Sequence, residues 1–231
     1  MNIDPIPSIA VVKQIIEANQ EAEIIQIVEY PTHKDLQDRI SLNGQETQYI
    51  ANALDLRERF KVPFWDSLLL EFMAQKKHSQ KILEEARYHA LANNIKKFPV
   101  KNFNAIEDYL ELHRDKYLAI SSRVECKGNK IMHIPLLDFR CPVDNYYLEL
   151  VTDILININI CPGYILVSGN SYQFYGLKLI SQSELVNFLA IALHYSPVVD
   201  KSFIAHHLRD LYCSLRLTKK NNLVPYAVKK I

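Results

Sequence analysis

Residues 117–140 read YLAISSRVECKGNKIMHIPLLDFR, two runs rich in apolar and β-branched residues on either side of the KGN stretch at 127–129. Such runs are typical of strands, and a glycine beside an asparagine is typical of the tight turn between two of them. We therefore predict strands over 117–125 and 131–139. Because Pro135 has no N–H to offer a sheet, the second strand should lie at an edge or contain a bulge.

Beyond this hairpin, helical and strand patterns alternate to the end of the sequence. The predicted elements are a helix over 147–158, strands over 164–167 and 172–179, helices over 185–193 and 202–211, and short strands around Leu215 and Tyr226. This order predicts an α/β (α+β) fold with a mixed sheet.

The first 98 residues have a different pattern, which is mainly helical. Apolar residues recur at helical spacing over 65–73, a charged helical stretch follows over 79–92, and residues 12–16 suggest another helix ahead of an apolar run at 22–28 that could be a strand. The pair Phe98-Pro99 marks a boundary, since the residue before a proline is pushed out of the helical region. We therefore expect a mainly helical N-terminal region, residues 1–98, and an α/β core, residues 99–231.

A short helix should open this core, because Asn104 and Glu107 have the spacing of a capping box.

The composition is that of an ordinary globular protein, with 231 residues, 48% hydrophobic, 23% charged and a net charge of +1. The first residues lack the basic start and apolar run of a signal peptide, and no apolar stretch approaches the roughly 20 residues that span a bilayer. The four scattered cysteines include no CxxC pair, which argues against a thiolate zinc site and against a disulfide framework. These features predict a cytoplasmic protein that does not enter a membrane.

The charge is unevenly distributed along the chain. Residues 201–231 contain seven Lys or Arg and one acid, a net charge of +6, so the remaining residues sum to −5. This asymmetry favours a phosphate-rich partner near the C-terminal segment, although a charge run is usually a solvated face.

Residues 134–142, IPLLDFRCP, close an apolar strand with one acid. Asp138 and Arg140 are two residues apart and should share one face of the strand, while Phe139 points to the other. Ligands often bind at strand ends in α/β sheets. Taken alone, however, the pair is explained more simply by a strand-end salt bridge.

Two further stretches carry polar residues at similar places. Residues 167–176, VSGNSYQFYG, predict a turn at Gly169-Asn170 between two strands, and backbone N–H groups of such a turn can either cradle a phosphate or simply form a polar hairpin. Residues 200–222, DKSFIAHHLRDLYCSLRLTKKNN, begin with an acid and end in a basic segment.

The order of these three stretches resembles the archaeo-eukaryotic primase (primase–polymerase) superfamily over residues 116–231. The resemblance implies a core of RRM-like topology beside a second α/β unit. It also implies an active site built from an Asp-x-Asp motif, a Ser-x-His motif and a third acid. In such a site the acids bind two divalent metal ions that clamp the oxygens of phosphoryl transfer, and the histidine and nearby basic residues hold a nucleoside triphosphate.

Carried over to this chain, the resemblance implies two kinds of site residue. They are the catalytic and metal-binding acids Asp138 and Asp200, and the nucleotide-binding residues Arg140, Ser171, Gln173, Arg209 and Arg216.

Two of these positions depart from the family pattern. Arg140 stands where the second acid is expected, which replaces a negative charge with a positive one and should weaken the binding of a divalent cation. Gln173 stands where the histidine is expected, and it can donate a hydrogen bond but carries no charge. One hypothesis is that Arg140 itself binds phosphate as a bidentate fork while Asp138 orients it.

The sequence therefore predicts a divergent primase-like protein that binds nucleotide or nucleic acid. It leaves open whether nucleotidyltransferase activity survives, and Mg²⁺ or Mn²⁺ would serve that activity. One alternative is a catalytically inactive primase-fold scaffold or subunit of a nucleic-acid-processing complex, whose first half docks a helicase or nuclease. Another is an RRM-like RNA binder that stacks bases on Tyr172, Phe174 or Tyr175 at an open sheet face.

Overall fold

The computed structural model describes residues 2–30, 44–62, 66–68, 95–219 and 223–231. The chain forms two compact units, one made of residues 1–31 together with 92–231, and the other of residues 32–91. This grouping differs from the division expected after residue 98, because Phe98 lies inside a strand of the first unit.

The described part of the second unit contains helix α3 (Gly44–Phe60) and a helical turn at residues 66–68. Apart from this turn, the helices predicted over 65–73 and 79–92 lie outside the described residues.

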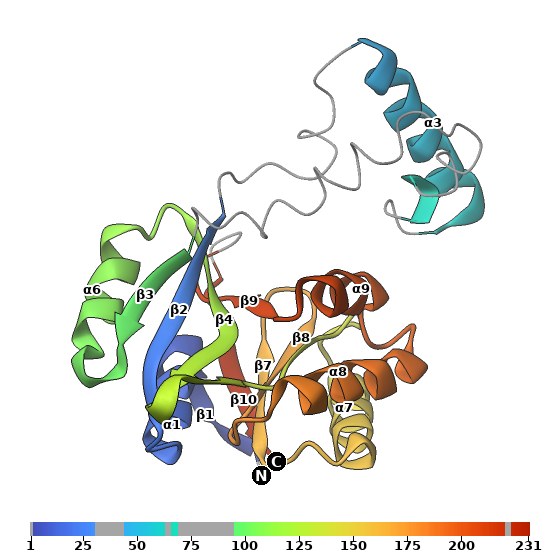
Figure 1. The fold of residues 1–231 in the computed structure, drawn as a ribbon. Coiled ribbons are helices and arrows are strands. Elements are labelled where there is room, and N and C mark those ends of the chain that lie inside the picture. The colour runs from blue at the N-terminus through green and yellow to red at the C-terminus, as the bar shows by residue number, and fades with distance from the viewer. Residues whose placement is uncertain (1, 31–43, 63–65, 69–94, 220–222) are drawn as a thin grey trace. The chain divides into compact units, whose positions relative to one another are not determined.

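One sheet of the first unit has five antiparallel strands in the order β1-β10-β7-β8-β6 (Figure 1). Their bounds are β1 (Asn2–Pro7), β6 (Leu136–Asp138), β7 (Gly163–Val167), β8 (Tyr172–Gly176) and β10 (Tyr226–Lys230). Helix α7 (Asn145–Ile158) connects β6 to β7, and these two strands run in the same direction because both pair antiparallel with β8 between them. This connection is a split βαβ unit, whereas the complete RRM-like topology stays a prediction.

The other sheet has the order β3-β2-β4-β5, and β9 pairs with β4. Its strands are β2 (Ala22–Tyr30), β3 (Ile95–Pro99), β4 (Tyr117–Cys126), β5 (Lys130–His133) and β9 (Ser214–Arg216). The first 98 residues thus supply β1, β2 and β3, and the prediction of a mainly helical N-terminal region was wrong. The partners that stabilise these strands come from distant parts of the chain, so local periodicity does not reveal them.

The predicted hairpin is confirmed, with one interruption. Gly128 and Asn129 have φ of 73° and 58°, the left-handed conformation that the turn needs. The strand predicted over 131–139 is divided into β5 and β6 by Ile134-Pro135, in accord with the bulge or edge expected from the proline. Strand β8 ends at Gly176, earlier than predicted, where a Cβ atom would lie 2.7 Å from the Pro135 ring.

The helices predicted in this unit are confirmed within a few residues. They are α1 (Ser8–Ala18), α6 (Asn104–Leu112), α7, α8 (Gln182–Ala192) and α9 (Lys201–Asp210). The unit also contains the short 3₁₀ helices η3 (Val100–Asn102), η4 (Lys127–Asn129) and η5 (Leu193–Tyr195). The capping box predicted at Asn104 is absent, because the N-cap of α6 is Phe103 and makes no side-chain cap. A complete capping box occurs instead at Ser181 and Glu184, where α8 begins.

The two sheets and their helices share one apolar core. Figure 1 shows β2, β3, β4 and α6 at one side of the unit and α7 and α8 at the other, with β7, β8 and β10 between them. Within the described ranges, no helix has both the length and the apolar character needed to cross a membrane.

Candidate functional site

The end of β6 lies between two neighbouring segments, and their register aligns three of the predicted site residues. On one side, Asp138 pairs with Gln173 of β8. On the other side, Phe139 forms a bridge with Val199, and the Asp200 amide donates to the Asp138 carbonyl at 3.0 Å. Residues opposite each other on antiparallel strands have Cβ atoms about 5 Å apart on the same face. Gln173, Asp138 and Asp200 therefore form a row.

A second row lies one step further along the strands. Arg140 shares the face of Asp138 because it is two residues away. The hydrogen bond from the Phe139 amide to the Tyr172 carbonyl, 3.0 Å long, continues the β6–β8 register and places Arg140 opposite Ser171. The two rows together bring five of the seven predicted nucleotide- and metal-binding residues onto one face.

This face opens into a pocket of about 560 Å³, within the size range of small-molecule sites. The pocket is lined by Asp138, Phe139, Arg140, Cys141, Pro142, Asn170, Ser171 and Asp200. Four of the predicted residues thus line one cavity. The sequence had not singled out Cys141 or Pro142, which are positioned by their place directly after Arg140.

The opposite face of β6 and β8 anchors these strands in the core. Leu137, Phe139, Tyr172 and Phe174 are all buried there. Tyr175, on the face of Gln173, is also fully buried. The three aromatic residues proposed to stack RNA bases are therefore not exposed, and the prediction of an RRM-like RNA binder with an open aromatic face was wrong.

Asp200 caps helix α9. Its Oδ1 atom accepts hydrogen bonds from the amides of Ser202 at 2.8 Å and Phe203 at 3.2 Å. A carboxylate at this position satisfies amides that have no partner inside the helix and interacts favourably with the helix dipole. The negative charge of Asp200 is therefore already stabilised by the protein.

Arg216 belongs to β9, is partly buried and is not among the residues that line the pocket. Its guanidinium donates to the carbonyls of Ser168 at 2.6 Å and Leu223 at 3.2 Å, and also to that of Thr218. Burial lowers the pKa of Arg216, and the charges of neighbouring groups, including Asp138, oppose this effect. Asp138 and Arg216 are thus close enough for their charges to interact, and Arg216 stabilises the negative charge of Asp138.

Arg140 has different surroundings. Its side chain is exposed and makes no hydrogen bond or ion pair in the described part of the chain, although its amide donates to the Val198 carbonyl at 2.7 Å. The hypothesis that Asp138 orients Arg140 therefore finds no contact to support it. The Ser171 hydroxyl donates to the Phe139 carbonyl, so it fixes the end of β6 to β8.

Gln173 is the remaining member of the first row. Only 6% of its surface is exposed, and its Oε1 atom has no hydrogen-bond partner within the described residues. A buried amide without a partner costs free energy, so a ligand that pairs with it gains affinity.

The positive charge near the C-terminus is less exposed than its sequence suggests. Lys229 is 9% exposed and pairs with Glu149 at 2.9 Å, and Arg216 is bound to carbonyls. Arg209 is exposed on the last turn of α9 and is not among the residues that line the pocket. The structure therefore does not bring Arg209 to the site.

The acids of the site are few. Asp138 and Asp200 are its two carboxylates, and no group of three or more His, Cys, Asp or Glu that could hold a metal ion occurs in the described part of the chain. Two catalytic metal ions with a shared substrate usually need more carboxylate oxygens than this. The donor set therefore does not fit a two-metal centre.

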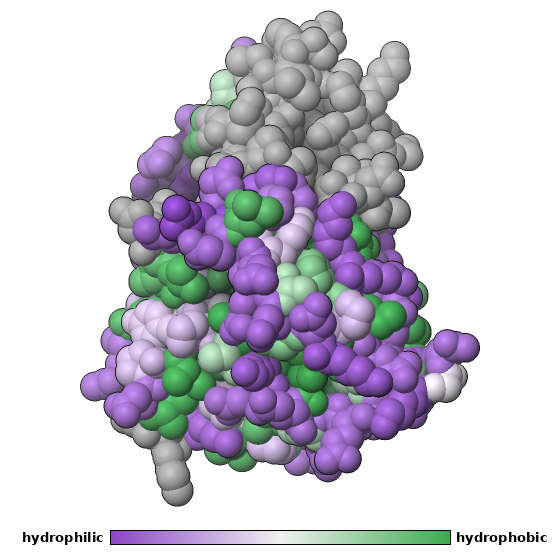
Figure 2. All heavy atoms as spheres, turned by 90° about the vertical axis from the view of Figure 1, so that its left-hand side faces the viewer, coloured by the Kyte–Doolittle hydropathy of each residue, from purple (hydrophilic) through white to green (hydrophobic). Residues whose placement is uncertain are grey.

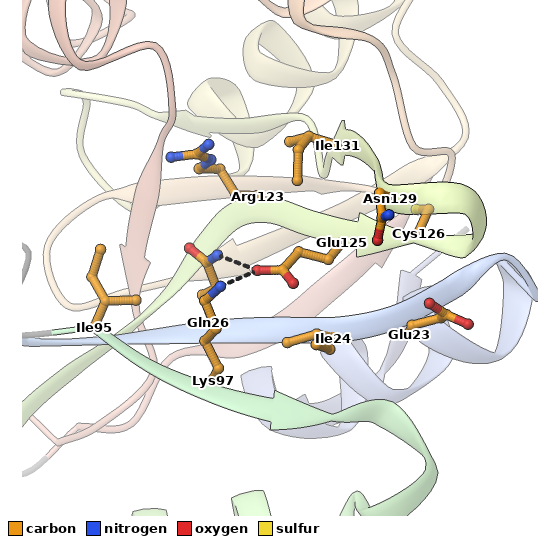
Figure 3. A pocket seen from close by; sticks show the side chains of 10 residues that line it. All are labelled: Glu23, Ile24, Gln26, Ile95, Lys97, Arg123, Glu125, Cys126, Asn129 and Ile131. Carbon is orange, nitrogen blue, oxygen red and sulfur yellow. Dashed lines mark hydrogen bonds and ion pairs between the residues drawn. The ribbon is translucent and has the colours of Figure 1, made fainter.

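A second pocket lies on the outer face of β2, β3 and β4 and is less suited to an anion. Figure 3 shows Gln26 and Lys97 both directed at the Glu125 carboxylate. The distances to Oε1 are 3.3 Å from Gln26 Nε2 and 2.5 Å from Lys97 Nζ. The hydrogen bond from Lys97 lowers the pKa of Glu125. The lysine charge is thus already neutralised.

The mixed α/β fold and the polar residues at a strand end are both features that the resemblance to the primase superfamily implies. The comparison with protein families agrees: residues 101–229 match the model of the archaeo-eukaryotic primase 1D-like domain. The match spans more than half of the chain and includes all seven predicted site residues, so the chain belongs to this family. No curated protein matches the sequence.

Proposed function

We propose that the protein binds the phosphates of a nucleotide or nucleic acid in the pocket formed by Asp138, Arg140, Asn170, Ser171 and Asp200. The observation that supports this best is the register of β6, which gathers residues from three separate stretches onto one face. Family membership supports the same class of ligand.

The roles follow from the surroundings of each side chain. Arg140 is the exposed cation that binds phosphate, and the buried Oε1 atom of Gln173 accepts a hydrogen bond from a hydroxyl group of the ligand. The charges of Asp138 and Arg216 interact and partly offset each other beside the ligand. The Asp200 carboxylate caps α9, and the Ser171 hydroxyl holds the end of β6 to β8.

A second candidate is a primase-fold subunit without catalytic activity, which assembles with a nuclease or helicase. The observation that favours it is Arg140, which stands at the place of a metal-binding acid. The face that carries α6 and β3 offers little to such a partner, since Figure 2 shows its hydrophobic residues scattered among hydrophilic ones.

The first test is thermal unfolding with each NTP, each dNTP and a single-stranded oligonucleotide, in the presence of Mn²⁺, for the wild type and Asp138→Ala. A ligand at about 100 times its dissociation constant stabilises the protein by roughly 2.7 kcal/mol, which raises the unfolding temperature by about 5–10 °C for a chain of this size. We expect a shift in the wild type. If Asp138→Ala abolishes it, the acid holds a cation that the ligand needs, and if the variant keeps it, the ligand binds without help from this acid. If no ligand raises the unfolding temperature, the subunit model is favoured instead.

Primer synthesis from labelled NTP or dNTP with Mn²⁺ then separates binding from transfer. Product formation that Asp138→Ala abolishes would establish residual nucleotidyltransferase activity. Binding without product is the outcome that the two-carboxylate site predicts.

A further inference from the structure

The two acids of the pocket have positive partners within the protein, whereas its arginine has no negative partner among the described residues. Asp200 is stabilised by two amides at the start of α9, and Asp138 interacts with the charge of Arg216. Each acid thus has a positive counterpart supplied by the protein itself. A divalent cation at this place would have to compete with these counterparts for the same carboxylates.

Arg140 has no such counterpart. It projects from the same face, opposite Ser171 and beside the turn at Gly169-Asn170, and its guanidinium has no hydrogen-bond or ion-pair partner within the described residues. The amides of Gly169, Asn170 and Ser171 likewise make no hydrogen bond in that part of the chain. A guanidinium and amides with unused N–H groups on one cavity are suited to phosphate oxygens.

The buried amide of Gln173 is an independent sign of a ligand. It lies in the row of Asp138, is 94% buried, and its Oε1 atom has no partner in the described residues. Because this oxygen only accepts hydrogen bonds, it can pair with a hydroxyl group of the ligand, and it needs no metal ion to do so.

We infer that the pocket binds a phosphate group through Arg140 and the unused backbone amides of residues 169–171, without a divalent cation. The inference rests on the proposed function and specifies how the same site works. Arg140 supplies the positive charge that a metal ion would otherwise provide, and the phosphate belongs to a free nucleotide or to a nucleic-acid backbone.

The test uses the full chain and isothermal titration with ATP, and separately with a single-stranded oligonucleotide that lacks terminal phosphates, in EDTA and in Mg²⁺. The variants are Arg140→Ala, Arg140→Lys and Arg140→Asp. The matched control is Arg114→Ala, an exposed arginine of the α6 end whose ion pair is with Glu111. Circular dichroism checks that each variant is folded.

We expect the wild type to bind equally well in EDTA and in Mg²⁺, with ATP or the oligonucleotide as the tighter ligand identifying the source of the phosphate. Arg140→Ala should weaken binding by about tenfold or more in both buffers, since hydrogen bonds to charged groups contribute that much. Arg140→Lys should retain part of the affinity, Arg114→Ala all of it. Arg140→Asp should show no binding in EDTA.

Two results would overturn the inference and leave the proposed function standing. One is wild-type binding that EDTA abolishes, and the other is Arg140→Ala binding as tightly as the wild type. If the wild type binds neither ligand in either buffer, the proposed function itself fails.

Discussion

Arg140 and Arg216 were both predicted to bind nucleotide, yet the structure gives their side chains different surroundings. The guanidinium of Arg216 is held by three carbonyls, two of which belong to the segment that follows β9. That of Arg140 is exposed and reaches no described partner. Sequence position alone would treat them as equivalent phosphate-binding residues.

Substitution of Arg216 should therefore lower the stability of the fold, whereas substitution of Arg140 should affect ligand binding and leave stability nearly unchanged. Arg216→Ala leaves three carbonyls without their donor and should lower the free energy of unfolding by about 2 kcal/mol or more. Arg140→Ala should change it by no more than about 0.5 kcal/mol, as is usual at exposed positions. Urea unfolding of both variants measures the difference, and equal losses would contradict the roles assigned here.

His133 is a single residue whose ionisation should make stability depend on pH. It is fully buried, its Nδ1 atom lies 3.1 Å from the Ser122 hydroxyl, and burial lowers its pKa to about 4 from 6.5. The unfolded chain therefore binds a proton at higher pH than the folded chain does. The stabilising contribution is complete above pH 6.5 and is lost as pH falls towards 4, by about 3 kcal/mol in total.

The measurement is the free energy of unfolding in urea between pH 7 and 4 for the wild type and His133→Asn, whose amide can replace the contact with Ser122. The wild type should lose more stability than the variant over this range. Parallel curves would show that His133 does not titrate in the unfolding transition.

At the scale of elements, the residue that begins α9 contributes both to the stability of this helix and to the candidate site. Asp200 both caps this helix and pairs through its amide with Asp138. Asp200→Ala should cost about 1 kcal/mol because it removes the cap, whereas Asp200→Asn should cost little because asparagine caps equally well. Thermal unfolding of both variants checks this, and equal losses would mean that the charge, rather than the cap, stabilises α9.

The packing of β7 against β8 is another property of elements. A Cβ atom at Gly163 would lie 2.2 Å from the Phe174 ring and 2.7 Å from the Tyr175 carbonyl. Gly163→Ala should therefore force these strands apart and destabilise the protein by about 1–3 kcal/mol. Gly169→Ala, in a turn where a Cβ meets no atom within 4 Å but φ is +124°, provides a comparison in which only backbone strain acts.

At the scale of the whole molecule, the first unit is assembled from two separated parts of the chain. Val28 of β2 pairs with Ile95 of β3, so the chain leaves and re-enters this sheet at neighbouring points. A short Gly/Ser linker in place of residues 32–91 should therefore preserve the unit. We expect this deletion variant to unfold cooperatively in urea.

Residues 101–231 alone, which cover the family match, should not fold in this way. They lack β2, which lies between β3 and β4, and β1, which pairs with β10. Cooperative unfolding of this fragment would contradict the division into units.

The sequence by itself determined the local features: the hairpin at 127–129, the helices from α6 onward, the face shared by Asp138 and Arg140, and the order of motifs that identified the family. These depend on periodicity, turn chemistry and spacing, all of which are encoded within short stretches. Only the tertiary structure placed Asp200 opposite Asp138 and gave the negative charge of each acid its own partner. The partner of Asp200 is the start of α9, and that of Asp138 is Arg216. It also bound the Arg216 guanidinium to backbone carbonyls, buried the aromatic residues of β8, and built β1, β2 and β3 into the sheets. Strand register and burial are set by contacts between residues far apart in the chain, which no local pattern specifies.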